Sequence, residues 1–157
     1  MNRVNDDACE KLRQTLARYH QTYVSAVENE FGQHGVEVLK KAFKELGRKS
    51  GEDLLRESVV KEKGLKGFLR YLSELTTITG FKFEIIEPSE RKKILRVHHC
   101  PYEIVWRKMQ ASKKVCEVLT QIDEGMAEAF CGRQIHLELA SSVFEGTPYC
   151  DYVFELK

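Results

Sequence analysis

The sequence of 157 residues lacks the features that mark several classes of protein. No apolar run approaches the ~20 residues that a membrane-spanning helix needs. The charged stretch from Met1 to Asp7 contains no apolar signal core. The five cysteines are odd in number and include no CxxC pair, so no disulfide framework is indicated. We therefore expect a cytoplasmic location and no membrane partner.

No charge of one sign predominates either, because 25 Lys and Arg stand against 24 Asp and Glu. The distribution is uneven: residues 1–114 carry 23 basic against 16 acidic side chains, and residues 115–157 carry 2 against 8. We expect the two parts to attract each other or a second copy of the chain. The basic residues alternate with glutamate at helical spacing, which is not the pattern of a basic binding domain, so no nucleic-acid partner is expected.

What the chain does have is an ordinary globular composition, with 42% hydrophobic and 31% charged residues. This length can bury a core without disulfide or metal support. We predict a single domain at 1–157, with a helical part at about 5–79 and a mixed α/β part at about 80–157. Amphipathic helices can leave apolar positions exposed, and these make a homodimer a reasonable expectation.

Apolar residues in the helical part recur at steps of three and four, the period of amphipathic helices. One predicted face runs through Cys9, Leu12, Leu16, Tyr19, Tyr23, Val27 and Phe31. Two further faces run from Val36 to Leu46 and from Leu65 to Leu75. We expect these helices to end at Gly32, Gly47 and Gly80, and the Ser50 to Asp53 segment to begin another.

The mixed part begins where the period changes to two, which is typical of half-buried strands. Strands are predicted at 81–86, 93–99, 135–143 and 149–156. Between the two pairs, Pro101 begins a short helix and residues 113–130 form a longer one. The prediction is an α+β fold: N-terminal helices packed on a small antiparallel sheet that is made of two hairpins separated by helices.

Five features carry a resemblance to a known family. They are Phe31-Gly32, the Gly47 to Gly51 spacing, Val97-His-His-Cys100-Pro101-Tyr102, Cys116 followed seven residues later by Asp123, and Gly146-Thr-Pro-Tyr-Cys150-Asp-Tyr-Val-Phe154. The chain resembles the L-2-amino-thiazoline-4-carboxylic acid hydrolase family, which is related to the vinyl-4-reductase type domain that binds small molecules. The resemblance implies hydrolysis of a C–N bond in a cyclic amidine such as a thiazoline carboxylate. The alternative is a non-catalytic domain that binds or senses a small organic ligand.

Two side chains are the catalytic candidates. Cys100 follows a predicted strand and precedes Pro101, so helix amide groups could favour its thiolate. The alternative for Cys100 is a small buried hydrophobic residue. Asp123 lies on a helix strip between apolar positions, where partial burial would raise its pKa and suit it to act as a general base. The alternative for Asp123 is a helix acid that faces solvent.

The remaining candidates are ligand-binding residues. Arg96 could hold a carboxylate, and the other side chains that could line a ligand site are His99, Tyr102, Trp106 and Cys116. Packing in the core is the alternative for the aromatic residues. We expect no cofactor. A zinc site made of Cys100, Glu145 and Cys150 is the less favoured alternative, since thiolates and a carboxylate can bind zinc.

Overall fold

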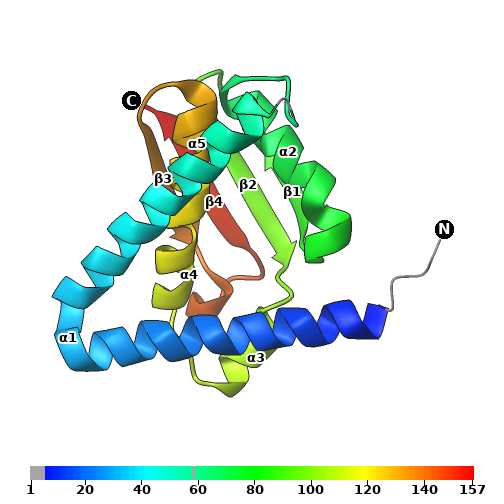
Figure 1. The fold of residues 1–157 in the computed structure, drawn as a ribbon. Helices are drawn as coiled ribbons and strands as arrows, with labels where there is room; N and C mark the ends of the chain where they lie inside the picture. Colours follow the sequence, from blue (N-terminus) through cyan, green and yellow to red (C-terminus); the bar gives the residue numbers. More distant parts are fainter. Residues whose placement is uncertain (1–5, 58) are drawn as a thin grey trace.

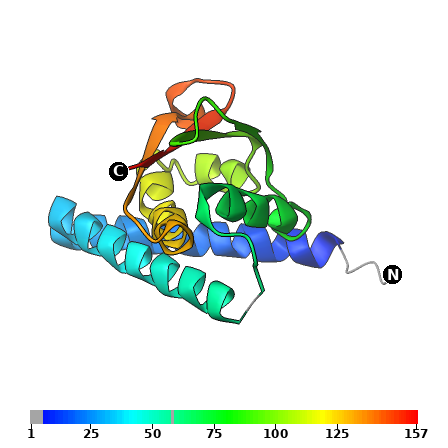
Figure 2. The ribbon, with the colours of Figure 1, turned by 90° about the horizontal axis from the view of Figure 1, so that it is seen from above.

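The computed structural model describes residues 6–57 and 59–157 as helices packed on one face of an antiparallel sheet (Figure 1). Residue 5, the predicted start of the helical part, lies outside these ranges. Seen from above, the sheet forms one layer, the shorter helices form the next, and the bent first helix lies outermost (Figure 2). The predicted α+β architecture is confirmed.

The first helix, α1 (Asp6–Arg56), is one long element with a sharp bend at Gly32. Gly32 has φ 61° and ψ −152°, a conformation that is open essentially to glycine alone. The predicted helix end at Gly47 and the predicted new start at Ser50 are both wrong. A Cβ atom at Gly47 would lie 2.0 Å from the carbonyl oxygen of Ile122, so this glycine allows close helix packing instead of ending the helix.

The buried face of the first limb of α1 also differs from the predicted one. Leu12, Tyr19 and Phe31 are 59%, 62% and 64% exposed, whereas Ala17 and Val24 are almost fully buried. The small Ala17 lets α1 approach α3 (Glu103–Lys108), where the indole Nε1 of Trp106 donates a hydrogen bond to the Ala17 carbonyl oxygen at 2.8 Å. The buried face of α1 is therefore the one that allows close approach to α3, and apolar content alone does not determine it.

The other helices follow the predictions more closely. Helix α2 (Gly64–Thr79) ends at Gly80, which has φ 80°, as expected for a helix-ending glycine. The single helix predicted at 113–130 is instead two, α4 (Lys114–Leu119) and α5 (Gln121–Cys131). They meet at Thr120, where ψ is −8° and the hydroxyl donates to the Cys116 carbonyl oxygen at 2.8 Å.

The four strands form one antiparallel sheet in the order β1-β2-β4-β3. Each predicted hairpin is present, and the two hairpins join through their second strands. In that pairing Leu95 lies opposite Tyr152 and Val97 lies opposite Cys150. The 3₁₀ helix η1 (Val143–Glu145) lies between the last two strands. The strands are β1 (Lys82–Ile86), β2 (Lys92–His99), β3 (Ile135–Ser141) and β4 (Cys150–Leu156).

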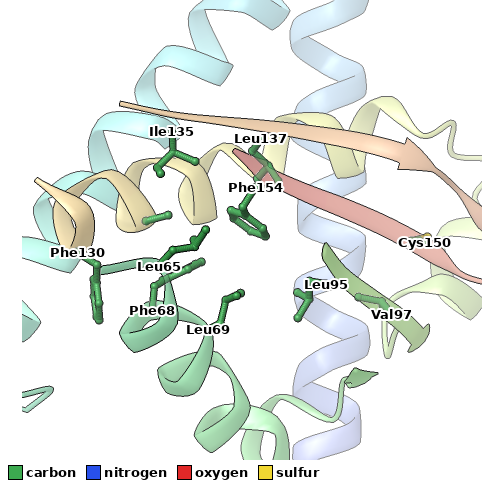
Figure 3. Packing of buried hydrophobic residues seen from close by; sticks show 11 residues of the cluster. Leu65, Phe68, Leu69, Leu95, Val97, Phe130, Ile135, Leu137, Cys150 and Phe154 are labelled. Atoms are coloured by element: carbon green, nitrogen blue, oxygen red, sulfur yellow. The ribbon is translucent and has the colours of Figure 1, made fainter. Parts of the chain in front are cut away.

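The hydrophobic core consists of two clusters. The larger lies between the sheet, α2 and α5, where the Phe68 ring packs against the rings of Phe130 and Phe154 (Figure 3). The smaller lies between α1, α3 and α4 and includes Trp106 and Val118. Among the described residues, no helix has the length and apolar character needed to cross a bilayer.

Candidate functional site

The two apolar clusters meet at a group of ionisable side chains, which we call the junction cluster. Cys100 packs against both apolar clusters, Cys116 belongs to the smaller and Cys150 to the larger. Tyr152 lies within electrostatic reach of all three thiols and of Asp123. The junction cluster comprises Cys100, Tyr102, Cys116, Asp123, Cys150 and Tyr152.

Asp123 is the acidic member of the junction cluster. It lies in the first turn of α5 and is half-buried. Its carboxylate accepts no hydrogen bond from the residues that the structure describes, and burial raises its pKa from 3.8 to about 7. The negative charge of Asp123 contributes to raising the pKa of both Tyr102 and Tyr152, so the carboxylate lies near two phenols. A carboxyl group with this pKa can accept or donate a proton near neutral pH.

Cys100 lies just after β2, as predicted, close to the backbone amides of Tyr102 and Glu103. These amides favour the thiolate, but burial has the larger effect and raises the Cys100 pKa to about 12. Burial also raises the pKa of Cys116, although the nearby Tyr152 side chain acts in the opposite direction. Both side chains are therefore neutral thiols at physiological pH, which makes them weak nucleophiles.

Arg96 and His99 lie outside the junction cluster. Arg96 alternates with the buried Leu95 and Val97, so it is on the face of the sheet that points away from the helices. Its Nε and one terminal nitrogen donate to the two carboxylate oxygens of Asp151 at 2.8 and 2.9 Å, and its guanidinium lies 4.0 Å from the Tyr149 ring centre. His99 is exposed at the end of β2.

Tyr102 and Trp106 belong to an aromatic group beside the junction cluster. The ring of His20 on α1 lies 5.5 Å from the Tyr102 ring and 6.5 Å from the Trp106 ring. The Nδ1 atom of His20 is buried and has no hydrogen-bond partner among the described residues. Burial lowers the pKa of His20, so the imidazole is neutral.

The predicted zinc alternative gains no support from the arrangement of its residues. The Nζ of Lys113 donates to the Glu145 carboxylate at 2.5 Å, and the Cys150 sulfur accepts a hydrogen bond from the Val143 amide at 3.4 Å. Across residues 6–57 and 59–157, no three His, Cys, Asp or Glu side chains gather in a way that could hold a metal ion.

Two hollows open on the surface of the described chain. One of about 350 Å³ lies between Arg48 and Arg133. The other, of about 160 Å³, lies between α1 and α3, with Arg18, Lys108 and Ile104 in its lining. Neither Cys100 nor Asp123 lines either of these two hollows.

Sequence reasoning missed three residues at or beside the site. Tyr152 lies two residues from both Cys150 and Phe154, so the period of a strand places all three on the inner face of β4, but Tyr152 was not chosen as a site residue. Arg13 and His20 share a helical stripe with the buried Ala17. Arg13, Ala17 and His20 are spaced by four and three residues, as one face of a helix requires. The neighbouring face through Leu12 is more apolar, so the sequence favoured that face instead.

The fold and the junction cluster define a small α+β domain with ionisable side chains in its interior. The chain superposes with a TM-score of 0.66 on a trafficking protein particle complex subunit 3 from Naegleria fowleri, solved covalently bound to palmitic acid; the match covers 92% of this chain and 95% of that one at 13% identity. It also superposes on the phenol-responsive sensory domain of the transcription activator PoxR, solved with phenol, with a TM-score of 0.60, 15% identity and coverage of 92% and 74%. At such low sequence identity, these superpositions show that the chains share a fold.

The family follows from the sequence match. The family model of L-2-amino-thiazoline-4-carboxylic acid hydrolase matches residues 12–154, so the chain belongs to that family and the predicted resemblance is confirmed. A search of curated proteins finds no match to this chain.

Proposed function

We propose that the protein binds a small organic molecule at the junction cluster, with Asp123 as the residue that recognises it. The observation that carries this proposal is the half-buried Asp123 carboxylate, which has no hydrogen-bond partner among the described residues. Burying a carboxylate without a partner costs free energy, and a ligand that donates hydrogen bonds to it would recover that cost.

The surroundings of Asp123 indicate the chemistry of this ligand. A carboxylate accepts hydrogen bonds from amidine, amine or hydroxyl groups. The phenol rings of Tyr102 and Tyr152 and the apolar clusters on either side suit a compact ring. The two solved structures of this fold, one with phenol and one with palmitic acid, support the idea that such a domain holds an organic molecule.

Hydrolysis of a cyclic amidine is the second candidate, and the family name favours it. With a pKa of about 7, Asp123 could take a proton from a water molecule as that water attacks the amidine carbon. The same carboxyl group would return the proton to the ring nitrogen as the C–N bond breaks. Direct attack by Cys100 is less favoured because its pKa of about 12 keeps it protonated.

Calorimetry with 2-amino-thiazoline-4-carboxylate, combined with detection of a ring-opened product, tests both candidates. Wild type and Cys100→Ala should bind the compound alike, and Asp123→Asn should bind about 10-fold or more weakly, as expected for loss of a charged hydrogen bond. The control is Glu138→Gln, which changes an exposed carboxylate on β3. Product formed by wild type and lost in Asp123→Asn would establish the hydrolase. Full affinity in Asp123→Asn would refute the proposed role of Asp123.

A further inference from the structure

The hollow between α1 and α3 is lined by two cations that have no side-chain partner within the described chain. Arg18 comes from α1, and Lys108 comes from the last turn of α3. The adjacent Arg107 donates to the Glu103 carboxylate at 2.7 Å. By contrast, neither Arg18 nor Lys108 forms a hydrogen bond or an ion pair through its side chain in residues 6–57 and 59–157. Both positive charges are therefore available to an anion in the hollow.

A hydrogen bond between the two helices fixes the backbone that carries these cations. The indole Nε1 of Trp106 donates to the Ala17 carbonyl oxygen at 2.8 Å, and both residues are buried. Arg18 directly follows Ala17, and Lys108 lies two residues after Trp106. Binding of an anion would therefore need to order only the two side chains, which costs less free energy than ordering backbone as well.

Most of the remaining lining is apolar. Pro101 and Val105 are buried, whereas Ile104 and Met109 are 63% and 37% exposed. Exposed apolar side chains that gather beside a hollow are typical of a binding surface. A molecule in the hollow would remove Ile104 and Met109 from water, and burial of apolar surface favours binding.

One carboxylate also lines the hollow, but the fold already matches its charge. Glu10 accepts a hydrogen bond from the Gln14 side-chain amide at 3.0 Å, and it lies 3.4 Å from a terminal nitrogen of Arg13. It precedes Arg18 by eight residues, which is about 12 Å along a helix. An anion bound at Arg18 is therefore separated from Glu10.

We propose that this hollow binds a small organic acid, with its carboxylate between Arg18 and Lys108 and a compact apolar ring or chain on Ile104 and Met109. A guanidinium suits a carboxylate because its planar donors match the two oxygens. At about 160 Å³ the hollow is smaller than the ~300–1,000 Å³ pockets of drug-sized ligands, so it suits a compact molecule.

This site is separate from the junction cluster. No residue of the junction cluster lines the hollow. Its ligand needs no basic group, unlike the ligand proposed for Asp123. The inference therefore does not rest on the proposed function.

A titration with benzoate, followed through the amide chemical shifts of the protein, tests the site. Benzoate carries one carboxylate on a compact ring, benzamide has the same shape without the charge, and acetate has the charge without the ring. We expect a dissociation constant of about 0.1–1 mM for benzoate, and at least about 10-fold weaker binding of the other two compounds. The largest shifts should occur around Arg18 and at residues 104–109.

Variants separate the charge from the apolar surface. Arg18→Gln and Lys108→Gln should each weaken benzoate binding by about 3- to 10-fold and leave benzamide binding unchanged. Ile104→Ser should weaken both compounds alike by about 3-fold. Lys41→Gln is the matched control, because it removes one positive charge from an exposed position of α1 outside the hollow. All four positions are exposed, and the amide spectra show whether each variant is folded.

Three results would overturn the proposed site. The first is equal affinity for benzoate and benzamide, or no binding of benzoate at about 10 mM. The second is unchanged benzoate binding in both Arg18→Gln and Lys108→Gln. The third is a set of shifts centred on Asp123 and Tyr152, which would place benzoate at the junction cluster. The binding role of Asp123 is measured with a different compound and is accepted or refuted separately.

Discussion

At the scale of single residues, environment sets the chemistry of the candidate side chains more than residue type does. Cys100 lies near two backbone amides that favour its thiolate, yet burial keeps it a neutral thiol. By sequence Asp123 could equally be a helix carboxylate that faces solvent, yet burial brings its pKa to about 7. Of the two catalytic candidates, Asp123 is therefore the one that exchanges a proton near neutral pH.

Asp123 should make the stability of the fold depend on pH. Its pKa is higher in the folded chain than in the unfolded chain, so the folded state binds the proton more tightly. The free energy of unfolding should consequently fall as pH rises from about 4 to about 7. Asp123→Asn should remove this fall and be more stable than wild type at pH 8 by about 2 kcal/mol, a value reduced because the side chain is only half-buried.

Urea unfolding of wild type and Asp123→Asn at pH 4.5 and pH 8 measures this difference. Glu138→Gln, an exposed carboxylate on β3, should follow the wild-type pH dependence. A parallel pH dependence of wild type and Asp123→Asn would show that the Asp123 carboxyl titrates as it does in the unfolded chain.

At the scale of elements, the packing of α1 on α5 depends on glycines that sequence reasoning took for helix ends or overlooked. A Cβ at Gly125 would lie 1.9 Å from the Lys44 carbonyl oxygen, and one at Gly47 would lie 2.0 Å from the Ile122 carbonyl oxygen. The two backbones therefore touch directly. The Lys44 ammonium then bridges the carboxylates of Glu124 and Glu128 at 2.6 and 2.9 Å across the same contact.

Gly125→Ala should destabilise the fold although alanine favours helices, because the added methyl group meets backbone that cannot move without separating α1 from α5. We expect a loss of about 2–4 kcal/mol in the free energy of unfolding. Lys41→Ala, which places an alanine at an exposed position of α1, should change stability by less than about 0.5 kcal/mol. Chemical denaturation compares the two, and a neutral Gly125→Ala would mean that the helices are not in backbone contact.

At the scale of the whole molecule, α1 and the other helices cover one face of the sheet (Figures 1 and 2). The two apolar clusters lie between these layers, and the junction cluster lies where they meet. The Asp123 carboxylate comes from α5, and the Tyr152 phenol comes from β4. A ligand held at the junction cluster would connect elements that are distant in the sequence. Its binding should stabilise the entire fold instead of one segment.

The increase in the free energy of unfolding that a bound ligand causes should depend on whether Asp123 is protonated. At 100 times the dissociation constant measured at pH 7.5, 2-amino-thiazoline-4-carboxylate should raise the free energy of unfolding by about 2.7 kcal/mol. At pH 5.5 the same concentration should add only about 1 kcal/mol, because most Asp123 side chains are then protonated. Thermal unfolding with and without ligand at both pH values measures this. Equal stabilisation at the two values would exclude pairing between the ligand and ionised Asp123.

The sequence by itself determined the kinds of element and most of their order. The change of period at Gly80 separates helices from strands, and the two hairpins form as predicted, because local side-chain alternation decides whether a segment can bury one face. The family was also readable from the motifs around Cys100, Asp123 and Cys150. The local sequence pattern was sufficient to predict the element types, the two hairpins and the family.

Only the tertiary structure decided which helix face is buried, that α1 continues through Gly47, and which charged groups lie near each other. Those features depend on contacts between residues far apart in the sequence, such as Gly47 with Ile122, and helical period does not encode such contacts. The site follows the same rule. Asp123 was visible as a candidate, but its pKa and the nearness of Tyr102 and Tyr152 arise from burial between two apolar clusters, which exists only in the folded chain.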